Sequence, residues 1–418
     1  MWLLILLIIV GSIYFLSMQG ITCCNSGSTY ALVKSLVEDR KLEINKYIKL
    51  TKFLDYANVN KKYYTDRPPG LAFTATPFYA IGLNVTLVCV IAGTLSSALV
   101  YLISMHLVKN PLISFATALI FAFCTLNWRY STIFIMHPLS TFLILISVYF
   151  FLLGYPIFLI GLILGLSTFF EYTDFVYFFG IGLTELITGN FSKILPLSIG
   201  FFIGVIPILA YNKRCFGSPL TTSYKYSAHF KWSNSFKTTF ITPISEGIKG
   251  LLFYIKNKNG IKIPGGILLV SPVLIFGIIG FLYMPFELLI LFLSITLPLF
   301  LLISKHKTYW AGGAGDYRYL SSMIPYITIP ISLTLNNLTF LWPIVLILAL
   351  ISLAMVILKM VILTISINDL NKIEPDLIKK IKSGNFSFLN LNAMGKFIAV
   401  IFDTLFIRKK RLEKTMGN

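Results

Sequence analysis

Residues 62–70, KYYTDRPPG, place two ionised side chains beside a rigid corner of the chain. Asp66 and Arg67 come directly before a Pro-Pro-Gly turn, in which the prolines restrict the backbone. A transferase that acts on a hydroxyl needs a carboxylate within hydrogen-bond reach of that hydroxyl, to accept its proton. The corner therefore supplies a candidate general base, Asp66, held next to a cation.

The polar loop that ends in this corner contains five carboxylates: Glu38, Asp39, Glu43, Asp55 and Asp66. The first three lie among basic residues, which is typical of the solvated end of a surface helix with ordinary ion pairs. Asp55 and Asp66 instead bracket a tyrosine-rich stretch. We take these two as candidate catalytic residues and Tyr64 as a candidate substrate contact. A turn cap by Asp66 and a lysine-paired Asp55 are the structural alternatives.

Two further carboxylates, Glu171 and Asp174, interrupt an apolar stretch that runs over 155–187. Ionisable groups inside a membrane are costly unless they face a water-filled cavity or a partner. We expect Glu171 to line a substrate cavity together with His137, which precedes a proline at a predicted helix start. If a short helix ends at residue 170, both acids instead emerge at the membrane surface.

Basic residues in three places could hold a phosphate. Arg67 is part of the corner, Lys213 follows the apolar run 194–211, and Arg318 follows a glycine-rich loop. Glycines let the backbone approach a ligand closely, and a guanidinium can bind two phosphate oxygens at once. An Asp316–Arg318 ion pair in a flexible loop and a plain basic helix end are the alternatives.

The composition is that of a polytopic membrane protein. Of 418 residues, 56% are hydrophobic and 12% are charged, and the mean hydropathy is +0.82. We expect membrane lipid as a partner and no nucleic acid. The apolar runs predict an all-α fold with about eleven transmembrane helices, the first of them uncleaved. The predicted spans are 1–18, 84–106, 111–127, 138–154, 156–170, 175–187, 194–211, 265–283, 286–303, 321–335 and 340–365.

Two long polar loops, 19–83 and 212–264, are separated by an even number of predicted spans and should lie on one face. Within the first, 30–38 and 69–81 have the apolar spacing of helices that lie along the membrane surface. The loops carry much of the net charge of +19. A positive-inside count would make them cytoplasmic, but that rule is weak for long loops.

The chain divides into a membrane domain over 1–365 and a polar, partly amphipathic tail over 366–418. Five cysteines have neither zinc-ligand nor redox-motif spacing, and no HExxH pattern is present. No metal ligands are predicted. A divalent cation is left open as a cofactor.

Several phrases in a fixed order resemble the C-type membrane glycosyltransferases, which include protein O-mannosyltransferases and aminoarabinose transferases. The resemblance extends from the first helix to about residue 330. The phrases are YYTDRPPG over 63–70, a Ser/Thr-rich stretch before His137, Glu171-Tyr172, YNKRCFGSPLTTSY over 211–224, and a Trp/Gly-rich loop that ends in YRYL at 317–320.

The resemblance implies an inverting transfer of a sugar from a polyprenyl-phosphate carrier, such as dolichyl phosphate, to a protein, lipid or glycan acceptor. It implies a multi-pass plasma-membrane protein with a long first extracytoplasmic loop and its active site on that face. A first-loop carboxylate would be the base, and Arg67, Lys213 and Arg318 would neutralise the phosphate.

One departure from the family pattern concerns 24–30, CNSGSTY, where many members carry an acidic residue. Either Asp55 or Asp66 takes that role, or the chain has a different or lost activity. Two other functions therefore remain open. One is a transporter or flippase of lipid-linked or small polar substrates, for which no internal repeat is found, and the other is a non-catalytic member of the same fold.

Overall fold

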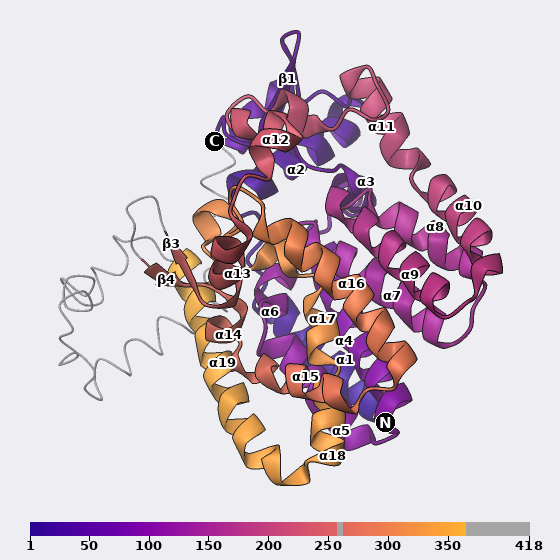
Figure 1. The fold of residues 1–418 in the computed structure, drawn as a ribbon. Coiled ribbons are helices and arrows are strands. Elements are labelled where there is room, and N and C mark those ends of the chain that lie inside the picture. Colours follow the sequence, from indigo (N-terminus) through magenta and orange to yellow (C-terminus); the bar gives the residue numbers. More distant parts are fainter. Residues whose placement is uncertain (257–261, 365–418) are drawn as a thin grey trace, which may run out of the picture.

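The computed structural model describes residues 1–256 and 262–364, and it consists mostly of helices (Figure 1). The membrane-domain helices are α1 (Trp2–Leu16), α4 (Leu87–Val108), α5 (Pro111–Phe123), α6 (Asn127–Ser131), α7 (His137–Leu152), α8 (Ile157–Ser167), α9 (Phe175–Ile187), α10 (Ile194–Gly204), α11 (Ile206–Phe216), α14 (Ile267–Val270), α15 (Ile275–Gly280), α16 (Phe286–Ser304), α17 (Ile324–Thr328), α18 (Ile331–Asn337) and α19 (Trp342–Thr364). The predicted tail, 366–418, lies outside the described residues.

The two long loops contain short helices and two small hairpins. The first loop forms α2 (Cys24–Lys34), the short helices Ser35–Asp39 and Asn45–Thr51, β1 (Tyr56–Val59), β2 (Lys62–Thr65) and α3 (Gly70–Ala80). The second forms a one-turn helix at Ser223–Tyr226, then α12 (Phe236–Thr239), α13 (Ile244–Leu252), β3 (Tyr254–Lys256) and β4 (Lys262–Pro264). Helix α3 coincides with the predicted helix 69–81, whereas α2 only overlaps the predicted 30–38 and is mostly buried. Their place along the membrane surface stays a prediction, and the hairpins are additions to the expected all-α fold.

Four helical segments of the described chain are long and apolar enough to cross a membrane: Leu87–Val108, Phe191–Phe216, Phe286–Ser304 and Thr339–Met360. Each coincides with a predicted span. Shorter apolar helices occupy most of the other predicted positions. The count of eleven spans therefore stays a prediction.

Prolines divide two of the predicted spans. The run 265–283 breaks between α14 and α15 at Pro272, and the run 321–335 divides into α17 and α18, with Pro330 just before the second helix. A proline removes one backbone donor and crowds the preceding turn, so a continuous helix is interrupted there. In Figure 1, these short pieces lie beside α16 and α19 in the lower half of the molecule.

Helix α4 lies in the middle of the bundle, where it packs against α1, α5 and α7 (Figure 1). Helices α8 and α10 form the closest contact. A Cβ atom on Gly161 would lie 2.1 Å from the Leu197 carbonyl oxygen, and one on Gly204 would lie 2.2 Å from that of Leu162. Small residues let helix backbones approach this closely, which favours association in lipid.

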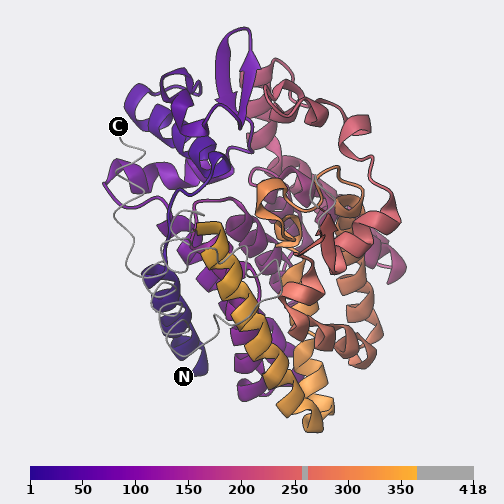
Figure 2. The same ribbon diagram turned by 90° about the vertical axis from the view of Figure 1, so that its left-hand side faces the viewer.

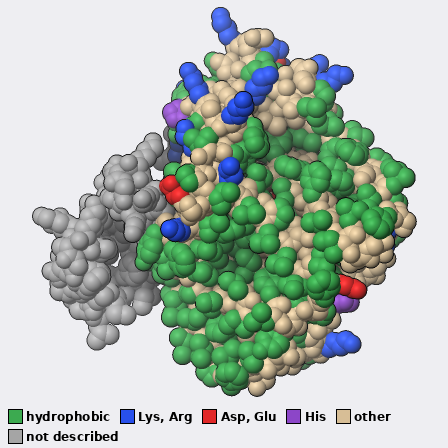
Figure 3. All heavy atoms as spheres, in the orientation of Figure 1, with side chains coloured by type: hydrophobic (Ala, Val, Ile, Leu, Met, Phe, Trp, Pro, Cys, Tyr) green, Lys and Arg blue, Asp and Glu red, His purple; other side chains and the backbone are tan. Residues whose placement is uncertain are grey.

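The two long loops meet at one end of the molecule, as predicted. The Ala228 N–H donates to the Tyr56 carbonyl over 3.0 Å, and Ala57 forms an isolated bridge with Ser227. Figure 2 shows the loops together above the bundle, and Figure 3 shows lysine and arginine side chains gathered over this end, with hydrophobic side chains covering much of the surface below. A basic cap thus lies above an apolar belt.

Candidate active site

The first hairpin brings Asp55 and Asp66 together. Its register pairs Tyr56 with Thr65, so the two aspartates that flank this pair lie at the same end of the hairpin. Arg67 binds both: its Nη2 lies 2.6 Å from Asp55 Oδ1, and its Nε lies 3.3 Å from Asp66 Oδ1. Arg67, and not a lysine, is therefore the partner of Asp55.

This arrangement is buried, since Asp55 is 3% and Asp66 is 1% exposed. Burial raises the pKa of Asp66 to about 7; Arg67 opposes the rise, and the Asp55 carboxylate adds to it. Burial alone would lower the pKa of Arg67, but the two aspartates raise it well above its usual range. The site therefore combines a permanent cation with a carboxyl group that can exchange a proton near neutral pH.

The second loop covers this corner. Ser223 Oγ donates to the Asp66 carbonyl over 2.9 Å. The Tyr172 hydroxyl lies 3.4 Å from Ser223 Oγ and 3.4 Å from Asn212 Oδ1, which ties the loop to the region around Glu171. Ser223 belongs to the phrase YNKRCFGSPLTTSY over 211–224, but nothing in that phrase marked this serine as the residue that contacts the corner.

His137 and Glu171 form a second pair close to Arg67. His137 is the first residue of α7, and its Nδ1 lies 3.5 Å from Glu171 Oε2. Burial raises the pKa of Glu171 to about 7, and the charges of Arg67 and Arg318 oppose the rise. Glu171 thus lies within electrostatic reach of both arginines. We call Asp55, Asp66, Arg67 and Glu171 the carboxylate cluster.

Asp174, the other acid predicted to interrupt the apolar stretch, is fully buried. It accepts a 2.7 Å hydrogen bond from Ser140 of α7. Burial raises its pKa well above the ordinary value, and the neighbouring Glu171 adds to the rise. Asp174 therefore ties α7 to the start of α9.

Arg318 reaches the site from the glycine-rich loop. Its backbone N–H donates to Asp316 Oδ1 over 3.1 Å, and its guanidinium lies over the Tyr319 ring, 5.5 Å from the centroid. The Tyr319 ring in turn packs edge-on against His137, with 6.4 Å between centroids. The alternative, an Asp316–Arg318 ion pair, is not formed, because Asp316 contacts the Arg318 backbone and leaves the guanidinium available.

Two predicted substrate contacts lie elsewhere. Tyr64 is buried in an edge-on contact with Phe216, 5.7 Å between centroids. Lys213 is exposed on α11. The structure therefore brings together six of the eight predicted residues, and it places these two where α11 meets the hairpin.

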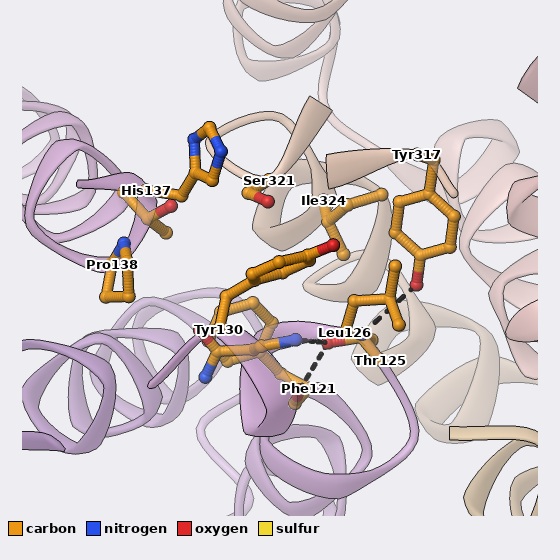
Figure 4. A pocket seen from close by; sticks show the side chains of 11 residues that line it. Phe121, Thr125, Leu126, Tyr130, His137, Pro138, Tyr317, Ser321 and Ile324 are labelled. Carbon is orange, nitrogen blue, oxygen red and sulfur yellow. Dashed lines mark hydrogen bonds between the residues drawn. The ribbon is translucent and has the colours of Figure 1, made fainter. Parts of the chain in front are cut away.

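A small pocket adjoins this site between α5, α6, α7 and α17. Figure 4 shows Tyr130, His137, Ser321, Tyr317 and Leu126 among its lining residues. Tyr130 packs edge-on against His137, 5.7 Å between centroids, and its hydroxyl donates to Asp316. Tyr130 therefore connects the pocket to the loop that carries Arg318.

Metal ligands do not gather in the described part of the chain: no group there has three or more His, Cys, Asp or Glu side chains placed to hold an ion. The five cysteines are free. A divalent cation stays a prediction.

Comparison with known proteins gives one clear likeness. No protein-family model matches the sequence, and no curated protein matches it. A crystal structure of ArnT from Cupriavidus metallidurans bound to undecaprenyl phosphate is similar in fold, with a TM-score of 0.61 and 12% identity. The alignment covers 97% of this chain and 76% of that one. The chain is thus an integral membrane protein with a polytopic fold like that of ArnT, in line with the resemblance to C-type glycosyltransferases.

Proposed function

We propose that this protein transfers a sugar from a polyprenyl-phosphate carrier to a hydroxyl of a protein, lipid or glycan acceptor, with inversion at the anomeric carbon. The observation that carries the proposal is the pair of buried aspartates held on one arginine, within a fold like that of ArnT. The neighbour was crystallised with undecaprenyl phosphate, which is the class of carrier that the proposal requires.

The chemistry requires a proton acceptor on one side of the sugar. Asp55 or Asp66 takes the proton of the acceptor hydroxyl as its oxygen bonds to the anomeric carbon. The bond between that carbon and the phosphate oxygen breaks, and its electron pair leaves with the polyprenyl phosphate. Arg67 orients both carboxylates, and His137 and Glu171 border the space beside them.

The leaving phosphate requires cations on the other side. Arg318 has a free guanidinium close to Glu171 and is the best placed of the predicted phosphate contacts. Arg67 is already bound to two carboxylates, and Lys213 lies on the exposed surface of α11. We therefore give Arg318 the larger share in stabilising the developing negative charge.

The position of Asp55 bears on the residue missing from the family pattern. Cys24 stands near the start of α2, where many members have an acid. Burial raises the pKa of the Cys24 thiol to about 12, and the charge of Asp55 and a hydrogen bond with it add to the rise. Asp55 thus lies beside Cys24, which supports catalysis over a non-catalytic role.

We place the site on the extracytoplasmic face of the plasma membrane, as the resemblance implies. The test is mass spectrometry of glycans and lipids from cells that lack the protein and from cells that produce the Asp55→Asn, Asp66→Asn double variant. Both should lose one sugar modification and accumulate its lipid-linked donor. Unchanged glycans and lipids in both strains would refute the proposal, and uptake of a substrate into sealed vesicles without a new glycosidic bond would favour transport.

A further inference from the structure

A second group of charged side chains lies where α6, the glycine-rich loop and the end of α19 meet. It consists of Arg129, Arg318, Lys359 and Asp316, and we call it the cation cluster. Arg129 Nη1 donates to the Lys359 carbonyl over 3.1 Å, and Lys359 Nζ donates to the Gly315 carbonyl over 2.8 Å. These bonds link three segments that are far apart in the sequence.

The cations of this cluster have no counter-charge in contact, and Arg318 is half-buried. Arg129 and Lys359 are each 9% exposed. Asp316 is fully buried and accepts bonds from the Tyr130 hydroxyl and the Arg318 backbone N–H. Within residues 1–256 and 262–364, no carboxylate lies within ion-pair distance of Arg129, Arg318 or Lys359.

Two guanidinium donors of the cluster are also unused. The Nε groups of Arg129 and Arg318 are buried and have no hydrogen-bond partner among the described residues. A buried charge is costly unless it is paired, and a buried N–H is costly unless it is bonded. Carbonyl contacts alone could be made by a neutral side chain such as glutamine, so they do not explain three cations here.

Tyr130 lies at the centre of the cluster. The Arg129 guanidinium lies over its ring, 5.4 Å from the centroid, and its hydroxyl donates to Asp316, which holds the Arg318 backbone. The same tyrosine lines the pocket beside His137 (Figure 4). The cluster therefore adjoins the space next to the candidate active site.

We propose that Arg129, Lys359 and Arg318 together bind a phosphate monoester. Planar guanidinium groups match phosphate oxygens in pairs, and an anion would use the free Nε donors and neutralise the buried charge. The identification of that ester as the head group of a polyprenyl carrier rests on the proposed function. Free phosphate shares the chemistry, and experiment separates the two sources.

The experiment measures thermal unfolding of the purified full-length protein in detergent, with farnesyl phosphate, farnesol or inorganic phosphate added. Farnesyl phosphate should raise the unfolding temperature and farnesol should not. Arg129→Gln and Lys359→Met should each weaken the affinity for farnesyl phosphate about tenfold or more, as expected when a charge-assisted hydrogen bond is lost. The matched controls Arg40→Gln and Lys237→Met change exposed residues and should bind as the wild type does.

The possible results are distinct. An equal rise with inorganic phosphate would keep the anion site but assign it to free phosphate. Wild-type affinity for farnesyl phosphate in both cluster variants, or in Arg129→Met and Lys359→Gln if the first pair fails to fold, would overturn the inference, as would no response of the wild type to either phosphate. Binding that depends on the cluster, in a protein that transfers no sugar, would keep this inference and refute the proposed function.

Discussion

The carboxylate cluster and the cation cluster solve the problem of buried charge in opposite ways. In the first, one arginine contacts two aspartates, and Glu171 lies close to His137. In the second, the one aspartate accepts hydrogen bonds from the Tyr130 hydroxyl and the Arg318 backbone N–H, and none of the three cations forms an ion pair with it. The charges of the first cluster are paired within the protein, although Arg67 Nε and Asp66 Oδ1 have no hydrogen-bond partner among the described residues. The cations of the second cluster have no carboxylate within ion-pair distance among the described residues. This difference is what the two proposals require, with proton exchange on one side of the site and anion binding on the other.

The largest effect should come from removing the carboxylates. If one of them is the base, Asp55→Asn or Asp66→Asn should lower the rate of sugar transfer by about 10²–10⁴-fold. The reason is that no carboxylate would then take the proton from the hydroxyl group of the sugar-accepting molecule. The rate of transfer is measured with protein whose unfolding temperature and farnesyl phosphate binding match the wild type. Full activity in both variants and in the double variant would show that the carboxylate cluster is not catalytic.

The next prediction tests the claim that charges are paired in the carboxylate cluster and unpaired in the cation cluster. Arg67→Met leaves two buried carboxylates without their cation and should cost about 3–5 kcal/mol of folding free energy. Lys359→Met removes one of several like charges and should cost less, about 1–3 kcal/mol for its hydrogen bond to the Gly315 carbonyl. Denaturant unfolding of both variants measures the two costs, and equal costs would contradict the comparison.

The pH dependence should also separate the clusters. Burial holds the pKa of Asp66 and of Glu171 at about 7, above the ordinary values of 3.8 and 4.5, so the folded state binds protons that the unfolded state releases. Stability from these groups is therefore fully present below about pH 4 and is lost as the pH rises through 7. Thermal unfolding between pH 5 and 8, at about one-unit steps, should show this decline.

Asp66→Asn should flatten that decline, and Glu171→Gln should flatten it further. The same variants decide which aspartate is the base. If it is Asp66, transfer by the wild type rises with pH through about 7, since the carboxyl group must be deprotonated to act. A rate that shows no step near pH 7 would leave Asp55 as the base.

The smallest effect should come from Lys213, one of the predicted substrate contacts that lie outside both clusters. Lys213 is exposed on α11, so Lys213→Met should change the folding free energy by less than about 0.5 kcal/mol. Its effect on transfer should be small compared with that of Arg318→Met, which removes a half-buried guanidinium whose Nε is buried. Steady-state kinetics of both variants make the comparison, and an equal loss would place Lys213 in the site.

The sequence predicted those parts of the site that are formed by neighbouring residues or that contain charged residues in an apolar stretch. The corner after Asp66, the helix α3, the meeting of the two loops and the proximity of Glu171 and His137 agree with expectations from the sequence pattern. The ion pairs of Glu38, Asp39 and Glu43 with nearby lysines were also expected and are present. Such features depend on spacing or on the cost of charge in lipid, and both can be recognised in one chain.

The remaining features depend on distant segments. The strands that place Asp55 opposite Asp66 contain several residues that favour strands, but each is only four residues long, too short to show a clear alternating pattern. The contact between Arg129 and Lys359 joins residues 230 positions apart. A lone lysine in the apolar run 340–365 was a recognisable mark of a buried charge, but its partners are set by how α19 packs.

The glycine contacts between α8 and α10 limit how this protein can vary. Where one backbone faces another directly, even one methyl group has no room, so Gly161, Gly165, Gly200 and Gly204 should tolerate no other residue. Neighbouring exposed positions such as Phe158 and Leu195 should accept almost any apolar side chain. Saturation mutagenesis of these two helices should therefore show that the four glycine positions accept no substitution, whereas the exposed positions around them accept many apolar residues.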